Sequence, residues 1–322
     1  MATSYFPAGA FGKLPHLGDF FKHNAGTREM LAFDQWLQQG ILYAKSQLKQ
    51  EWDAVFDAAP AYHFLFYADN PERFLLGIFQ PSEDKTVRKY PFWVSLQIER
   101  NSLGTELLPL TPVLFTSFFQ QTHSLLQEAR NGLSVPEISA RVEALKSGAQ
   151  IERRQQFYHE YLDGTTLEDL LQGALGGFED SRKYLLFKNL VDMLVPLRNQ
   201  ELNRVNLGLR FPLGVHPQTR TFEVCFWFRL CKTLLAASPL VPVMFWNAGQ
   251  PEQKAYLHFY FRPPSAKNFL PLLRAEEQSD TLCKLEEEGL TLLTSSEGAL
   301  SASARASLQT PGMSLNQFIQ GF

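Results

Sequence analysis

The sequence has little of what marks several large classes of protein. It contains only 3 cysteines among 322 residues, at positions 225, 231 and 283, and none forms a Cys-x-x-Cys pair. This excludes a disulfide framework and favours buried thiols in a reducing compartment. No apolar run reaches the roughly 18 residues of a membrane-spanning helix. The first residues lack a basic segment followed by a long apolar one, so we expect no signal peptide and a soluble, cytoplasmic protein.

A surplus of charge is also absent. The net charge is −3 and the isoelectric point is about 6.2. Because nucleic-acid binding depends on neutralising phosphates, this balance argues against a nucleic-acid partner. Hydrophobic residues make up 45% of the chain and include 27 phenylalanines, which predicts a packed, phenylalanine-rich core. The length permits one large domain or two ordinary ones.

Alternating aromatic and branched residues predict several strands. A hairpin is predicted from segments 62–67 and 73–79. They flank Asp69-Asn70-Pro71, and these three residue types favour tight turns. Segment 91–98 adds a third strand to this sheet. Further strands are expected at 8–14 and 206–213, and a second hairpin at 241–246 and 255–261.

Helical spacing dominates elsewhere. A helix is expected from Thr27, with Met30, Phe33 and Leu37 on one apolar stripe that Trp36 broadens. A shorter helix at 52–56, a mostly helical region at 112–200 and a helix at 266–274 are also predicted. Segment 222–235 suits either a strand or a buried helix, and we favour the helix. Segment 16–24 is interpreted as a loop, 274–288 as a charged stretch, 295–310 as loosely ordered, and 314–322 as a docking tail or a frayed end.

These elements predict an α/β fold of the α+β type. Helices on both faces of the strands give a three-layer α-β-α sandwich, and recurring hairpins make its mixed sheet largely antiparallel.

Motifs for catalysis or metal binding are weak. A phosphate-binding loop around Gly12-Lys13 is excluded, because Pro7 and Leu14 stand where it needs glycine and a hydroxyl. Two histidines and an aspartate share the 16–23 loop without a clear fourth metal ligand, and there is no Gly-x-Ser-x-Gly elbow. We therefore expect no catalytic residue, metal or cofactor, and hence no enzyme.

Two blocks of sequence resemble a known family. The first is Phe11-Gly12-Lys13-Leu14-Pro15-x-x-Gly18-Asp19-Phe20, followed by Phe33-Asp34-x-Trp36-Leu37. The second is Gly77-x-x-x-Pro81-Ser82-x-Asp84-x-x-x-Arg88-x-Tyr90-Pro91. Together they resemble the TagF/ImpM family of bacterial type VI secretion accessory proteins. Val87 stands where the family often has glycine, which predicts a different turn. The clear resemblance covers about residues 6–100.

The resemblance implies a domain over 6–275, made of a signature part (6–100), a helical part (112–200) and a strand-helix part (206–275), before an extension at 276–322. It implies a non-catalytic, post-translational repressor of type VI secretion that binds the FHA-domain scaffold protein of that system. The alternatives are a small-molecule or nucleotide-binding sensor that uses the 13–21 and 80–91 loops, or, less well supported, a hydrolase.

The candidate partner-binding residues lie in these two loops. They are Lys13, Asp19, Phe20, Ser82, Asp84 and Arg88. Arg88 can pair with Asp84 or with Asp19, and Phe20 can stand exposed or fasten its loop to the core. A purely structural polar connection between strands is the competing interpretation.

Overall fold

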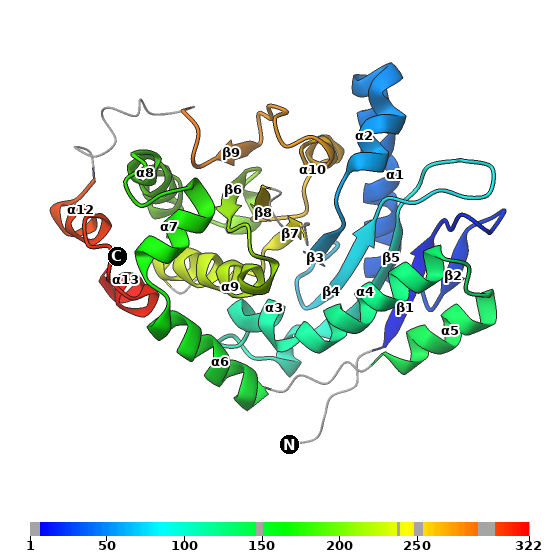
Figure 1. The fold of residues 1–322 in the computed structure, drawn as a ribbon, viewed down its shortest axis with the longest axis horizontal. Helices are drawn as coiled ribbons and strands as arrows, with labels where there is room; N and C mark the ends of the chain where they lie inside the picture. Colours follow the sequence, from blue (N-terminus) through cyan, green and yellow to red (C-terminus); the bar gives the residue numbers. More distant parts are fainter. Residues whose placement is uncertain (1–6, 146–150, 237–238, 248–253, 289–299, 322) are drawn as a thin grey trace.

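The computed structural model describes residues 7–145, 151–236, 239–247, 254–288 and 300–321 (Figure 1). Their strands form one nine-stranded sheet in the order β2-β1-β5-β4-β3-β7-β8-β6-β9. The strands are β1 (Ala8–Gly12), β2 (Phe21–His23), β3 (Tyr62–Phe66), β4 (Arg73–Gln80), β5 (Phe92–Glu99), β6 (Gly208–Leu213), β7 (Val243–Asn247), β8 (Ala255–Tyr260) and β9 (Leu282–Lys284). Every neighbouring pair is antiparallel except β6 and β9, so the predicted mixed, largely antiparallel sheet is confirmed.

Helices cover both faces of this sheet. They are α1 (Arg28–Leu48), α2 (Trp52–Ala58), α3 (Thr111–Leu114), α4 (Thr116–Arg130), α5 (Val135–Ala144), α6 (Ile151–Gly164), α7 (Leu167–Leu175), α8 (Arg182–Leu194), α9 (Pro217–Leu234), α10 (Leu270–Leu273), α12 (Ala302–Leu308) and α13 (Leu315–Gly321). Short 3-10 helices include η1 (Lys49–Glu51), η2 (Arg100–Ser102), η3 (Leu108–Leu110), η4 (Val195–Leu197), η5 (Leu202–Arg204) and η6 (Ala266–Phe269). Helix α1 and η6 lie on one face, and α4 and α9 lie on the other, which gives the predicted three layers.

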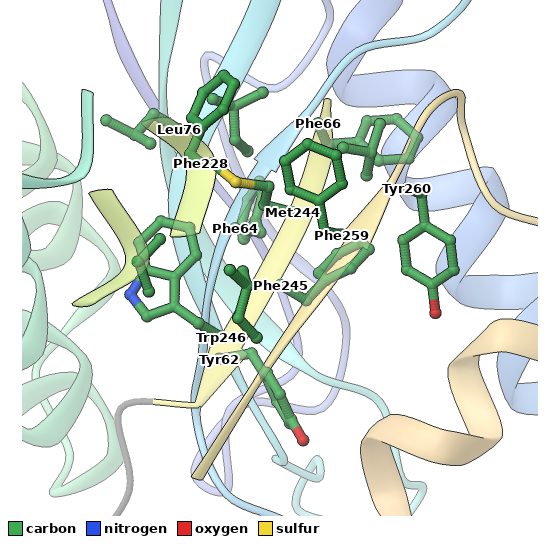
Figure 2. Close-up of a cluster of buried hydrophobic side chains, with 14 of the residues drawn as sticks. Tyr62, Phe64, Phe66, Leu76, Phe228, Met244, Phe245, Trp246, Phe259 and Tyr260 are labelled. Carbon is green, nitrogen blue, oxygen red and sulfur yellow. The ribbon is translucent and has the colours of Figure 1, made fainter. Parts of the chain in front are cut away.

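The alternation of side chains along β7 shows how the two faces are filled. Phe245 and Trp246 point to opposite sides of the strand in Figure 2. Phe245 stacks on Trp36 of α1 with 4.9 Å between ring centroids, whereas Trp246 meets the edge of Phe119 of α4 at 5.8 Å. Successive residues of a strand face opposite sides, so both layers of the core are aromatic.

Helix α1 packs as its sequence predicts. The hydroxyl of Thr27 accepts from the backbone N–H of Met30 and so caps the first turn. Phe33 is fully buried and stacks on Phe64 of β3 at 4.2 Å. Trp36, also buried, donates its indole N–H to the carbonyl of Ser265. The predicted apolar stripe is therefore the face that α1 turns toward the sheet.

The ambiguous segment 222–235 is helical, as favoured. It lies within α9, where Trp227 packs on Phe211 of β6 and Phe228 on Phe259 of β8. On another side of the same helix, Phe226 faces Phe318 of α13. Burial on most sides of the helix explains why the segment has no clear helical stripe.

Three short elements correct the sequence-based assignment. Segment 16–24 contains strand β2 at the sheet edge, and the charged stretch 274–288 contains β9. Strand β9 is tolerated there because the buried Arg210 beside it pairs with Glu286 and Glu287. In 295–310, interpreted as loosely ordered, residues 302–308 form α12, and 295–299 lie outside the described residues.

The C-terminal segment docks onto the domain. Figure 1 shows α12 and α13 at the red end of the colour scale, with α13 beside α6 and α12 near α8. The backbone N–H groups of Leu167 and Leu315 donate to the carbonyls of Met313 and Thr165, respectively. Phe318 is buried against Phe187 of α8. Of the two alternatives for this segment, the docking tail is the one observed.

Candidate functional site

The loop between β4 and β5 is organised by one carboxylate, that of Asp84. Its Oδ1 accepts from the backbone N–H of Thr86 at 2.9 Å, the hydroxyl of Thr86 at 2.6 Å and the backbone N–H of Arg88 at 3.1 Å. Its Oδ2 accepts from Lys13 Nζ and Arg88 Nε, both at 2.7 Å. Aspartate favours such a turn, because its short carboxylate side chain reaches backbone amides two to four residues on.

Asp84 also joins two parts of the chain that are far apart in sequence. Lys13 follows β1, and its ion pair with Asp84 is buried, with side-chain exposures of 6% and 0%. The backbone N–H of Lys85 donates to the carbonyl of Leu17, and Arg88 Nη2 donates to the carbonyl of Gly18. The 13–21 loop and the 80–91 loop therefore form one connected structure.

The electrostatics of this structure keep Asp84 charged. Burial alone would raise the pKa of its carboxyl group. Hydrogen bonds from Lys13, from Thr86 and from the Arg88 backbone N–H outweigh burial and hold the pKa well below its usual range. Asp84 is a permanent anion near neutral pH and fixes the positions of its donors.

Aromatic rings surround the same ion pair. Phe20 stacks on Phe11 with centroids 5.1 Å apart and meets the edge of Tyr90 at 5.1 Å. Lys13 Nζ lies 5.0 Å from the centre of the Phe20 ring. The Tyr90 hydroxyl donates to the carboxylate of Asp34 on α1, and burial together with that carboxylate raises the pKa of Tyr90. The packing holds Phe20 in one orientation although 42% of it is exposed.

A groove opens beside the loops, and sequence reasoning did not find it. Its volume is about 560 Å³, and α1, η1 and α2 supply one wall. The lining residues are Lys13, Phe20, Lys45, Lys49, Trp52, Asp53, Val87, Arg88, Lys89 and Tyr90. Five of these side chains are cationic and one is acidic. Lys13, Arg88 and Lys89 are paired with carboxylates, so the positive charge that the groove presents comes chiefly from Lys45 and Lys49. The signal that could have revealed it is Lys45, Lys49 and Trp52 at helical spacing, yet their side of α1 could not be related to a loop some forty residues away.

The backbone is strained on both sides of this groove. Val87 has a φ of +64° and Lys49 a φ of +50°. Non-glycine residues rarely adopt this left-handed conformation, and a β-branched valine is a particular outlier. The resemblance predicted that Val87 would make the loop turn differently from one with glycine. Val87 adopts a conformation that favours glycine, and whether the turn differs from that of a relative stays a prediction.

Comparison with known proteins agrees with the two sequence blocks. Residues 9–145 match the TagF N-terminal domain, which is type VI secretion system-associated. Residues 9–145 therefore correspond to a TagF N-terminal domain. The crystal structure of PA0076 from Pseudomonas aeruginosa PAO1 is similar in fold, with a TM-score of 0.50 and 18% identity over 84% of this chain and 96% of that chain. None of the curated proteins matches the chain.

Within this TagF domain, the six candidate residues divide by burial. Lys13, Ser82 and Asp84 are at most 7% exposed, so they lie beneath the surface and hold the loops together. Asp19, Phe20 and Arg88 are exposed at their rim. The buried three can position a contact surface, while the exposed three, with Val87 at 62% exposure, can touch a partner.

The contacts in the structure show which partner Arg88 has and how Phe20 is placed, two questions that the sequence left open. Arg88 pairs with Asp84, whereas the Asp19 carboxylate accepts from the backbone N–H of Phe20. Ser82 contributes its backbone carbonyl, which accepts from the N–H of Tyr90, and no described residue hydrogen-bonds its buried hydroxyl. Phe20 both stands exposed and packs on the loop, so the two interpretations of this residue apply together.

His16 of the TagF domain lies in the loop before β2, and His23 is the last residue of that strand. His23 lies 3.3 Å from the carboxylate of Glu143 on α5. Across the part of the chain that the structure describes, no group of three or more histidine, cysteine, aspartate or glutamate side chains could hold a metal ion. In the same residues, no helix is both long and apolar enough to cross a membrane.

Proposed function

We propose that this chain is a non-catalytic regulator that restrains type VI secretion after translation, by binding the FHA-domain scaffold protein of that system in the cytoplasm. The family match of residues 9–145 supports the association with type VI secretion. The restraint and the scaffold partner are implied by the TagF resemblance, and the surface of the two loops supplies a suitable contact.

The observation that carries this proposal is the rigid junction of the two loops. The buried Lys13–Asp84 pair fixes both loops from below, and Phe20, Val87 and Arg88 project at the rim. A surface that is ordered before binding loses less conformational entropy on association. Aromatic and arginine side chains surrounded by well-packed neighbours are also the residues that most often dominate binding energy.

The same contacts support a role without catalysis. All the oxygens of Asp84 are engaged by five donors within the loops. Its low pKa makes it a poor general acid or base near neutral pH, where an effective group needs a pKa close to 7. The polar cluster around Asp84 therefore stabilises the two loops.

Secretion itself tests this function. Deleting the gene should raise release of the secretion tube protein, and restoring the wild-type chain should lower it again. A chain with Phe20→Ser and Arg88→Gln should keep its fold, because the buried Lys13–Asp84 pair still joins the loops, yet fail to restore restraint. Val135→Ser is a matched control, since Val135 is 45% exposed on α5, away from the groove lining. Unchanged secretion after deletion, with the apparatus expressed, contradicts the proposal.

One observation favours a second candidate, a sensor of small molecules. The groove combines the cations Lys45, Lys49 and Arg88 with aromatic rings, a combination that suits an anionic aromatic ligand such as a nucleotide. A sensor predicts a saturable rise in melting temperature with one nucleotide, and loss of that rise in Arg88→Ala. A ligand at 100 times its dissociation constant stabilises by about 2.7 kcal/mol. A regulator that only binds protein shows no such rise.

A further inference from the structure

We propose that a second pocket, at the junction of η3, α6 and α9, binds a small oxyanion through a carboxylate or phosphate group. The pocket measures about 310 Å³. Its lining residues are Glu106, Pro109, Leu110, Gln155, Tyr158, His159, Arg229, Lys232 and Thr233. Helix α9 covers the sheet face opposite α1, so this pocket is separate from the groove beside the two loops.

Lys232 gives the first reason. It is only 8% exposed, and its ammonium group donates to the backbone carbonyl of Thr105 at 3.0 Å. No carboxylate of the described residues lies within ion-pair distance of it. Lysine is almost never so deeply buried without a counter-charge, because removing an ammonium group from water is costly. An anion in the pocket would supply the missing charge.

Arg229 gives the second reason to expect an anion in this pocket. It precedes Lys232 by three residues on α9, so both side chains lie on the same helix face. It is half-buried and, like Lys232, forms no ion pair with a carboxylate in the described ranges. Glu106 also lines the pocket, but it is exposed and pairs with neither cation. Two neighbouring cations repel each other, and a bound anion would turn that repulsion into attraction.

Tyr158 gives the third reason to expect an anion in this pocket. Its ring is fully buried, and its hydroxyl has no hydrogen-bond partner of standard geometry among the residues described. Burial raises the pKa of Tyr158 well above its usual value, although the charge of Arg229 and a side-chain hydrogen bond from it oppose part of this. The hydroxyl therefore stays protonated and can donate. A guanidinium fork, an ammonium group and a hydroxyl together match the several acceptor oxygens of a carboxylate or phosphate.

Thermal melting with inorganic phosphate and with acetate, each against sodium chloride of equal ionic strength, tests the site. We expect a saturable rise in melting temperature with at least one of them. A phosphate-only rise assigns a phosphate group, and an acetate-only rise assigns a carboxylate. Arg229→Gln and Lys232→Gln should each weaken the binding at least tenfold, whereas Lys267→Gln, an exposed lysine in η6, should leave it unchanged.

Tyr158→Phe separates binding from folding. Without added anion its melting temperature should stay close to that of the wild type, because the hydroxyl has no hydrogen-bond partner of standard geometry among the described residues. With the anion, the rise should be smaller than in the wild type. The proposal is overturned if neither anion gives a saturable rise in the wild type. It is equally overturned if the rise persists in the Arg229→Gln and Lys232→Gln variants, because the anion then binds elsewhere.

Discussion

Asp84 organises the site at the scale of single residues. A buried carboxylate is costly unless it is paired and hydrogen-bonded. Here two cations, one hydroxyl and two backbone N–H groups satisfy it. The cations differ in burial: Lys13 is buried with Asp84, whereas the Arg88 side chain is 59% exposed. The Lys13 interaction should therefore contribute more to stability than the Arg88 interaction.

Replacing Asp84 tests this assignment. Asp84→Asn leaves Lys13 buried without a counter-charge, and we expect a loss of roughly 3–5 kcal/mol in the free energy of unfolding. Arg88→Gln should cost under about 1 kcal/mol, because its ion pair is largely exposed to solvent. Urea denaturation followed by circular dichroism measures both changes.

The effect of Asp84→Asn should depend on pH. The pKa of Asp84 is held low in the folded chain. Its contribution is therefore complete above the unfolded pKa of about 3.9 and is lost as the pH falls further, toward the folded pKa. The difference between wild type and Asp84→Asn should be constant from about pH 7 to pH 5 and shrink below about pH 4. A difference that grows in acid would contradict this role.

Val87 allows a test of backbone strain. Its φ of +64° costs an L-residue roughly 1–2 kcal/mol, and the side chain is too exposed to recover this by packing. Val87→Gly removes the strain but adds freedom to the unfolded chain, so we expect a net stabilisation of about 0.5–1 kcal/mol. Val87→Ala keeps a Cβ and should gain less. If glycine destabilises more than alanine does, the left-handed conformation is not a source of strain.

The sequence predicted the composition of this site better than its geometry. The sequence named two loops that the structure joins, and a pair between Arg88 and Asp84 was one of two options. That the six candidate residues bind a partner stays a prediction. The burial of Lys13 and Ser82 could not be predicted, because it depends on how closely two loops about seventy residues apart approach each other. The groove was missed for the same reason, since Lys45, Lys49 and Trp52 belong to another element.

At the scale of secondary structure, α1 shows how one small residue sets the distance between layers. Gly40 lies in the middle of the helix, facing η6. A Cβ added to it would lie 2.6 Å from Cβ and 2.8 Å from Cγ of the buried Phe269. Alanine is normally preferred to glycine in a helix by about 1 kcal/mol. The close approach of η6 reverses that preference.

We therefore expect Gly40→Ala to destabilise the protein by roughly 1–3 kcal/mol, the usual cost of overpacking a core. The combination of Gly40→Ala with Phe269→Leu should recover part of the loss if a collision with the ring causes it. Thermal melting of the single variants and the double variant measures this. A Gly40→Ala variant as stable as the wild type would mean that η6 can move away from α1 easily.

Elements with a strong period were predictable, and those without one were not. Strands β3 to β5 and helix α1 follow from alternation and from an apolar stripe. Strands β2 and β9 have three residues each, too few for a period to show, and they exist because a longer neighbour supplies hydrogen bonds. Helix α12 was missed because its serine- and alanine-rich sequence is typical of flexible segments, while tertiary packing of Leu308 stabilises it.

At the scale of the whole molecule, the sheet unites the two halves of the chain. The TagF N-terminal match covers residues 9–145 and contains all of β2 to β5 and β1 except its first residue. Strand β3, at one side of this group, pairs with β7 from the C-terminal half. The matched region therefore contributes part of a larger sheet, and the helices of both halves give that sheet its two outer layers. The division into 6–275 and 276–322 stays a prediction.

This arrangement makes the loop surface a rigid part of a large body. The loops join β1 to β2 and β4 to β5, which are neighbours in the sheet, and the Tyr90 hydroxyl ties them to α1 through Asp34. A partner that contacts Phe20, Val87 and Arg88 would therefore meet a surface supported by both the sheet and a helix. Its binding should depend on those exposed side chains rather than on a folding step.

The most direct test of this account is the affinity of the purified chain for the purified FHA-domain scaffold protein, measured by isothermal titration calorimetry. We predict saturable binding that Phe20→Ser and Val87→Ser each weaken at least tenfold, while Val135→Ser leaves the dissociation constant unchanged. Circular dichroism of each variant checks that its fold is intact. No binding by the wild-type chain, or equal binding by all of the folded variants, would contradict the account.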